Sequence, residues 1–226
     1  MDIINLVKII TTLITTIIAM IIGFRVFFLD RKDWLNRWFA LFFISSAIGF
    51  LIYVSYHLIL NNANIIIPLM ITAQIFFNIN TVSLAMTVFV LEKYTKVAMS
   101  IRYFGVMVII FFVMSIGYFI FIPSLNQSAY AIGIVDTITP PGWLLFVNVS
   151  RILIVIYVAS KYILMLRKVE EAMKNRILWF TIGVIVIIIG LSINLAGGTL
   201  SSIIMEIVAL IILDVGSILL FKAFYL

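Results

Sequence analysis

A few polar side chains inside long apolar stretches are the residues of this sequence that could do chemistry. Arg151 and Asn148 lie deep in one stretch, and Gln74 lies at a similar depth in an earlier one. Ionisable groups inside a membrane are costly, so each of them suggests a function. The arginine fork binds oxygen atoms bidentately, which suits an anionic or carbonyl-bearing ligand. We predict a ligand pocket, with a hydrogen-bonded clasp between helices as the alternative; its residues are Arg151, Gln74, Asn148 and Glu206.

Acidic residues of the last apolar stretch have two expected roles. Glu206 lies about as far into the last stretch as Lys8 lies into the first, so the two are predicted to pair if these helices are neighbours. The alternative is that Lys8 extends its ammonium group to the membrane surface. Asp214 is the deepest acid, and Asn78 lies at comparable depth. We predict that Asp214 and Asn78 form a conformational switch or an ion site, with hydrogen bonding that only joins helices as the alternative.

The residue types that the sequence lacks narrow the chemistry further. It contains no cysteine and a single histidine, His57. Disulfides, thiolate metal sites and a haem with two histidine ligands are therefore excluded. No nucleophile with an adjacent base, and no pair of acids within one helical turn, can be assembled from the remaining residues. We predict a non-enzymatic protein that needs neither a metal ion nor a cofactor.

Composition identifies the elements that must position these side chains. Of the 226 residues, 65% are apolar and only 11% are charged, whereas soluble domains contain about 25% charged residues. Most of the surface must therefore face lipid, and the predicted fold is an all-α integral membrane protein, a single seven-helix transmembrane domain over residues 1–226 in contact with the lipid bilayer. The expected spans are residues 3–24, 38–60, 65–91, 98–122, 143–165, 177–196 and 200–222.

Lysine and arginine predict the orientation of this bundle. Thirteen of the fifteen basic residues fall at one side, namely after the first, third and fifth segments and at the end of the seventh. Because basic residues concentrate on the cytoplasmic side, we predict a multi-pass protein of the cell membrane with its N-terminus outside and its C-terminus in the cytoplasm. The net charge of +6 then reflects membrane orientation, and no nucleic acid partner is expected.

Tryptophans stand at the boundaries of the predicted spans. Trp34, Trp38 and Trp179 lie at inner boundaries and Trp143 at an outer one. Tryptophan is enriched where the membrane meets water. We expect these residues to be interfacial anchors, with core packing as the alternative.

The connection over residues 124–142 is the longest on the outer side. It contains Asp136 and the pair Pro140-Pro141. We expect it to be either a lid over an outward-facing pocket or only a connector.

The second segment begins with Asn36-Arg37-Trp38-Phe39-Ala40, and the third ends with Glu92-Lys93-Tyr94-Thr95-Lys96. These motifs resemble the seven-helix sensor region at the N-terminus of many prokaryotic histidine kinases. A longer outer loop follows the fourth segment, and a charged inner loop follows the fifth. The resemblance covers essentially the whole sequence and implies a sensory function. That family region normally precedes an output domain, and none follows Leu226 here, so we expect the signal to leave through a partner.

The leading hypothesis is therefore a non-enzymatic membrane sensor. It would bind a small apolar or anionic ligand in the outer half of the bundle. Its basic inner loops would then dock a soluble signalling partner or anionic lipid headgroups. A small transporter or an ion or proton channel using Asp214 is one alternative, which a flux assay separates from the first. An accessory subunit of a larger membrane complex is another, and co-purification in mild detergent tests it.

Overall fold

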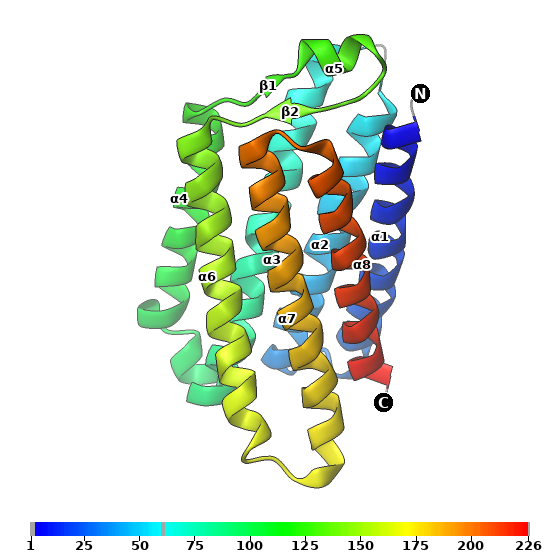
Figure 1. The fold of residues 1–226 in the computed structure, drawn as a ribbon. Coiled ribbons are helices and arrows are strands. Elements are labelled where there is room, and N and C mark those ends of the chain that lie inside the picture. The colour runs from blue at the N-terminus through cyan, green and yellow to red at the C-terminus, as the bar shows by residue number, and fades with distance from the viewer. Residues whose placement is uncertain (1–2, 60–61, 226) are drawn as a thin grey trace.

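Long helices make up almost the whole molecule (Figure 1). The computed structural model describes residues 3–59 and 62–225, so residue 60, the predicted end of the second span, lies outside the described residues. A chain within lipid must satisfy its backbone hydrogen bonds internally, which helices do. The long helices are α1 (Ile3–Leu29), α2 (Trp34–Leu58), α3 (Ala63–Ala98), α4 (Val106–Ile120, preceded by the π-helical turn η1, Ile101–Gly105), α6 (Pro141–Leu166), α7 (Glu171–Leu200) and α8 (Ile203–Tyr225).

The prediction of an all-α membrane protein is confirmed at this level. Within the described residues, seven helices are long and apolar enough to cross a membrane, η1 and α4 together forming one of them. Large apolar side chains also cover the outside of the bundle. Ile10 on α1, Ile109 on α4 and Leu153 on α6 are at least half exposed, as expected of surfaces that contact lipid acyl chains. The protein is therefore a multi-pass membrane protein.

Neighbouring helices form a closed ring. Helices α1, α2 and α3 pack in sequence order, α6 packs against both α3 and α7, and α8 packs against both α7 and α1. Helix α4 lies mainly against α3, outside the ring, and touches α6 at a few positions. The ring joins the first and last of these helices, so residues far apart in the sequence face one another.

The two ends of the bundle carry different segments of the chain (Figure 1). The N-terminus lies at the end that carries residues 121–140, which we call the loop end. The C-terminus and the connection between α6 and α7 lie at the opposite end, which we call the basic end because it carries the clustered lysines and arginines. At the loop end, β1 (Ser124–Leu125) pairs with β2 (Thr137–Ile138) in antiparallel fashion, and α5 (Gln127–Ala131) lies between them.

Helix α7 extends further than the predicted span, which ended before the pair Gly197-Gly198. It continues through both glycines to Leu200 and ends at Ser201, which has a left-handed conformation (φ 51°, ψ 39°). A Cβ atom at Gly197 would lie 3.1 Å from the backbone nitrogen of Glu206. Gly197 thus permits close packing of α7 on α8, and Gly198 faces Leu144 of α6, so neither glycine ends the helix.

Aromatic side chains fill the core at the basic end. Phe39 of α2, Phe180 of α7 and Phe224 of α8 meet edge to face, with ring centroids 5.4 to 6.1 Å apart. The expectation of interfacial anchoring is wrong for Trp38 and Trp143, because both are buried. Trp38 packs against Phe104, and Trp143 stacks on Phe121, so ring packing rather than contact with headgroups fixes these two side chains.

Candidate functional site

A cavity of about 270 Å³ lies inside the ring. All seven long helices line it, and so do residues of the loop between α4 and α6. Polar side chains from Asn126 and Asp136 lie at its loop end, whereas Phe42, Phe43 and Leu220 line its deeper part. Apolar and polar side chains both contribute to the lining of this concave space, and concave spaces of this kind are where proteins bind small molecules.

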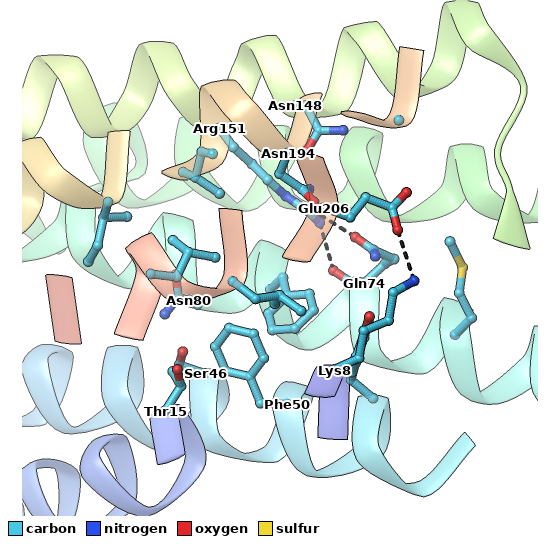
Figure 2. A pocket seen from close by; sticks show the side chains of 18 of the residues that line it. Lys8, Thr15, Ser46, Phe50, Gln74, Asn80, Asn148, Arg151, Asn194 and Glu206 are labelled. Atoms are coloured by element: carbon cyan, nitrogen blue, oxygen red, sulfur yellow. Dashed lines mark hydrogen bonds and ion pairs between the residues drawn. The ribbon is translucent and has the colours of Figure 1, made fainter. Parts of the chain in front are cut away.

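Arg151 of α6 is the most highly coordinated side chain in this cavity. Its Nε donates to Asn78 Oδ1 at 3.0 Å, and its Nη2 donates to the same oxygen at 2.6 Å. Its Nη1 donates to Gln74 Oε1 at 2.9 Å, and Nη2 donates to the Gln74 backbone oxygen at 3.1 Å. Gln74 and Asn78 are four residues apart on α3, so they share one face of that helix. The arginine is thereby fixed between α6 and α3 (Figure 2).

Supporting contacts hold the two amides in turn. Tyr118 of α4 donates to Gln74 Oε1 at 3.2 Å, and Asn78 Nδ2 donates to Ser115 Oγ, also at 3.2 Å. These bonds orient both amide oxygens toward the arginine. The guanidinium group is therefore positioned before any ligand arrives.

Lys8 and Glu206 form an ion pair on another wall of the cavity (Figure 2). The Lys8 Nζ atom lies 3.0 Å from Glu206 Oε2, and the Lys8 side chain is only 2% exposed. The predicted pairing is confirmed, and the alternative in which Lys8 extends to the membrane surface is wrong. The pair also joins α1 to α8 where the ring closes.

The four residues predicted to form a ligand pocket, namely Arg151, Gln74, Asn148 and Glu206, all line this cavity. Gln74 contacts Arg151 directly, whereas Asn148 donates to the Leu144 backbone oxygen at 2.9 Å. The side chain of Glu206 is directed to Lys8 rather than to Arg151.

The predicted switch residues, Asp214 and Asn78, are held by different partners. Asn78 bonds to Arg151, whereas Asp214 accepts a hydrogen bond from the Thr15 hydroxyl of α1. Thr15 lines the deeper part of the cavity, so Asp214 lies behind the cavity wall. Within the described residues, no hydrogen bond joins the two proposed switch residues.

Comparisons with protein-family models, with curated proteins and with solved structures found no match. The chemistry of this site therefore has to be argued from its own geometry.

Asn194 of α7 and Asn80 of α3 also line the cavity and were not among the predicted site residues. Asn80 donates to the Phe42 backbone oxygen at 3.0 Å. The side chain of Asn194 makes no hydrogen bond to any residue that the structure describes, and it is half-buried. An amide inside an apolar span was the available signal for both residues.

Residues of the 121–140 loop form a roof over the cavity. Asn126 Nδ2 donates to Asp136 Oδ2 at 2.8 Å, and the two backbones are joined by a bond from Asn126 N to Asp136 O at 3.0 Å. Asp136, Thr137 and Thr139 all line the space beneath. The loop therefore contributes to the cavity wall as well as connecting α4 to α6.

Proposed function

We propose that this protein is a non-enzymatic membrane sensor that binds a small ligand in the cavity beneath the loop. The loop end faces outward and the basic end faces the cytoplasm. Ligand binding changes the packing of the helices, and the change is read at the basic end by a soluble partner or by anionic lipid headgroups. No catalytic step is assigned to the cavity.

One observation carries this proposal, namely that every one of the seven long helices lines the same cavity. A ligand in such a position contacts all the elements whose relative placement defines the bundle. Any difference in its contacts between two arrangements of the helices shifts their populations. A binding event in this cavity can therefore be transmitted without a separate domain.

Helices α3 and α6 supply a route from the cavity to the basic end. They share the bonds between Arg151 and the α3 amides in the cavity. Nearer the basic end they share a second contact, an ion pair of 2.8 Å between Lys161 Nζ and Glu92 Oε1. A shift of α6 relative to α3 at the cavity would therefore reach the charged surface near Glu92.

A variant that fills the cavity tests the proposal. Ser46 of α2 lines the cavity (Figure 2), whereas Leu51 of the same helix is 46% exposed on the outside of the bundle. We expect Ser46→Phe to abolish binding of small fragments that the wild-type protein and Leu51→Phe both retain. Saturation-transfer NMR on protein in lipid nanodiscs, with a library of small acids, alcohols and amines, measures this. Equal binding to Ser46→Phe, or no fragment bound by the wild type, would contradict the proposal.

The same preparation can show whether ligand binding in the cavity changes the structure of the basic end. Because the sequence contains no cysteine, spin labels can be attached at Lys96→Cys and Lys168→Cys without removing native thiols. We expect the distance distribution between these labels to change when a bound fragment saturates the cavity. An unchanged distribution would limit the function to binding.

A further inference from the structure

We propose that the cavity takes a small monoanion with an apolar body, a carboxylic acid whose carboxylate binds Arg151. This inference rests on the proposed function, since it names the ligand class of the same cavity. It is argued from the charges that line the cavity, from the unused donors, and from the size of the space.

Arg151 is the buried charge of the cavity that lacks a counterion. Four charged side chains line the cavity: Lys8, Asp136, Arg151 and Glu206. Lys8 and Glu206 neutralise each other, whereas Asp136 is partly exposed in the roof and bonds to the neutral Asn126 amide. Arg151 is 6% exposed and interacts only with neutral groups; among the described residues, no carboxylate lies within ion-pair distance of it. A buried cation in a low-dielectric interior is stabilised strongly by an anion.

Unused donors mark the place where that anion would bind. An arginine has five N–H donors, and four are engaged by the α3 oxygens. The remaining N–H is on Nη1, and the neutral Tyr118 hydroxyl also interacts with the guanidinium group. The Asn194 side chain lines the same cavity from α7, next to α6, and its amide has no partner among the described residues. A carboxylate accepts several such bonds at once, whereas an alcohol or amide accepts fewer.

The rest of the cavity favours an apolar body of modest size. A volume of 270 Å³ corresponds to about nine water molecules at ~30 Å³ each, so the ligand has roughly that many heavy atoms. Phe77 lies on the wall with its ring centroid 6.0 Å from the Arg151 Cζ, and Phe50 packs against Phe77 with ring centroids 4.9 Å apart. An aromatic ring or a short alkyl chain would pack against these rings.

Other ligand classes fit these observations less well. A simple cation would be repelled by the buried Arg151 charge, and of the two acids in the lining Glu206 is already paired with Lys8 and Asp136 lies in the roof. A zwitterion would have to reach Asp136 in the roof, or displace Lys8 from Glu206, before its own ammonium group could bind. A neutral ligand would leave the arginine without a counterion.

Three probes of nearly equal shape test the assignment: phenylacetate, 2-phenylethanol and 2-phenylethylamine. Dissociation constants are measured by NMR titration of the protein in nanodiscs made of uncharged lipid. We expect phenylacetate to bind at least about 10-fold more tightly than the alcohol, and the amine to bind least. Equal affinity for acid and alcohol, or tighter binding of the amine, overturns the anion assignment and leaves cavity binding intact. If the wild type binds none of the three, both this inference and the proposed function fail.

Two variants test whether the preference for phenylacetate over 2-phenylethanol arises in the cavity. Arg151→Gln should remove the preference for acid over alcohol. Because that variant also weakens the α3–α6 contact and can unfold, Asn194→Asp is the more telling change: it adds a carboxylate to the cavity wall and leaves the bonds from Arg151 to α3 intact. We expect Asn194→Asp to weaken phenylacetate about 10-fold and to leave 2-phenylethanol unchanged, with Asn194→Ala as the neutral control. An unchanged phenylacetate affinity in Asn194→Asp overturns the inference.

Discussion

Buried charged side chains constrain which helices of this bundle meet. Lys8 is 1% exposed, and its charge is balanced by one acid, Glu206. Such a pair adds little net stability, because removing both ions from water offsets their attraction. It does fix which helices meet, since an uncompensated ammonium group inside the bundle would be far costlier than the pair.

Removing one partner of this pair should therefore be much worse than removing both. We expect Glu206→Gln to lower the free energy of unfolding by roughly 3–5 kcal/mol, because it leaves Lys8 buried and unpaired. The double variant Lys8→Met with Glu206→Met should recover most of that loss. Unfolding in mixed detergent micelles measures both.

An exposed ion pair supplies the matched control. Lys174 and Glu171 are 2.7 Å apart, but their side chains are 49% and 86% exposed. Glu171→Gln should leave the unfolding transition where it is. If Glu206→Gln also leaves the unfolding transition unchanged, Lys8 is hydrated in the cavity and the ion pair does not decide that α1 packs against α8.

At the residue scale, sequence alone can predict which polar groups lie inside but not all of their partners. The Lys8–Glu206 pair could be predicted because the two residues lie at equal depth and a closed ring brings the first and last helices together. Asn78 was grouped with Asp214 but bonds to Arg151 instead, because depth along a helix says nothing about direction around it. Its spacing of four from Gln74 does give that direction, and would have placed it with Arg151. Asn194 was missed because it lies near the predicted end of its span, where a polar residue is unremarkable.

At the scale of elements, the contact of α4 with α6 depends on one glycine. The face of α4 at Gly117 receives the indole of Trp143 from α6, and a Cβ atom at this position would lie 2.0 Å from the indole Cη2. Tyr118 and Phe121 complete the contact with the same ring. Helix α4 is therefore located by a close approach that only glycine permits.

We expect Gly117→Ala to destabilise the protein by about 1–3 kcal/mol, because the Trp143 indole must leave its position. Gly142→Ala is a matched control in the first turn of α6, since nothing lies within 4 Å of a Cβ atom there. That change should be neutral or slightly stabilising, because alanine favours helix more than glycine does. Thermal unfolding of the two variants side by side checks this, and equal melting temperatures would refute the role given to Gly117.

Element boundaries could be predicted where a residue forces them and not elsewhere. Asp33 ends the first connection by accepting a bond from the Leu35 nitrogen, and Pro141 begins α6; both are ordinary helix-start signals. Gly197 was interpreted as a helix end, but in a membrane protein a glycine often marks a close helix contact instead. Distinguishing the two requires the neighbouring helix, which the local sequence does not supply.

At the scale of the whole molecule, the asymmetry of charge between the two ends predicts the orientation in the membrane. We expect Ile132→Cys, which is 68% exposed in the wild type after α5, to react with a membrane-impermeant maleimide from outside intact cells. Lys168→Cys, exposed at the basic end, should react only after permeabilisation. The absence of native cysteine makes the unmodified protein the blank. The reverse labelling pattern would contradict the orientation.

The contact between α1 and α8 can form only late in synthesis of the chain. Lys8 and Glu206 are 198 residues apart in the chain, so at ~5–20 residues per second a ribosome needs about 10–40 s to supply the acid after the lysine. During that interval the nascent bundle holds an unpaired ammonium group, and the cavity lacks a wall. The ring can close only after α8 has entered the membrane, so a ligand present earlier in synthesis has no completed cavity to bind.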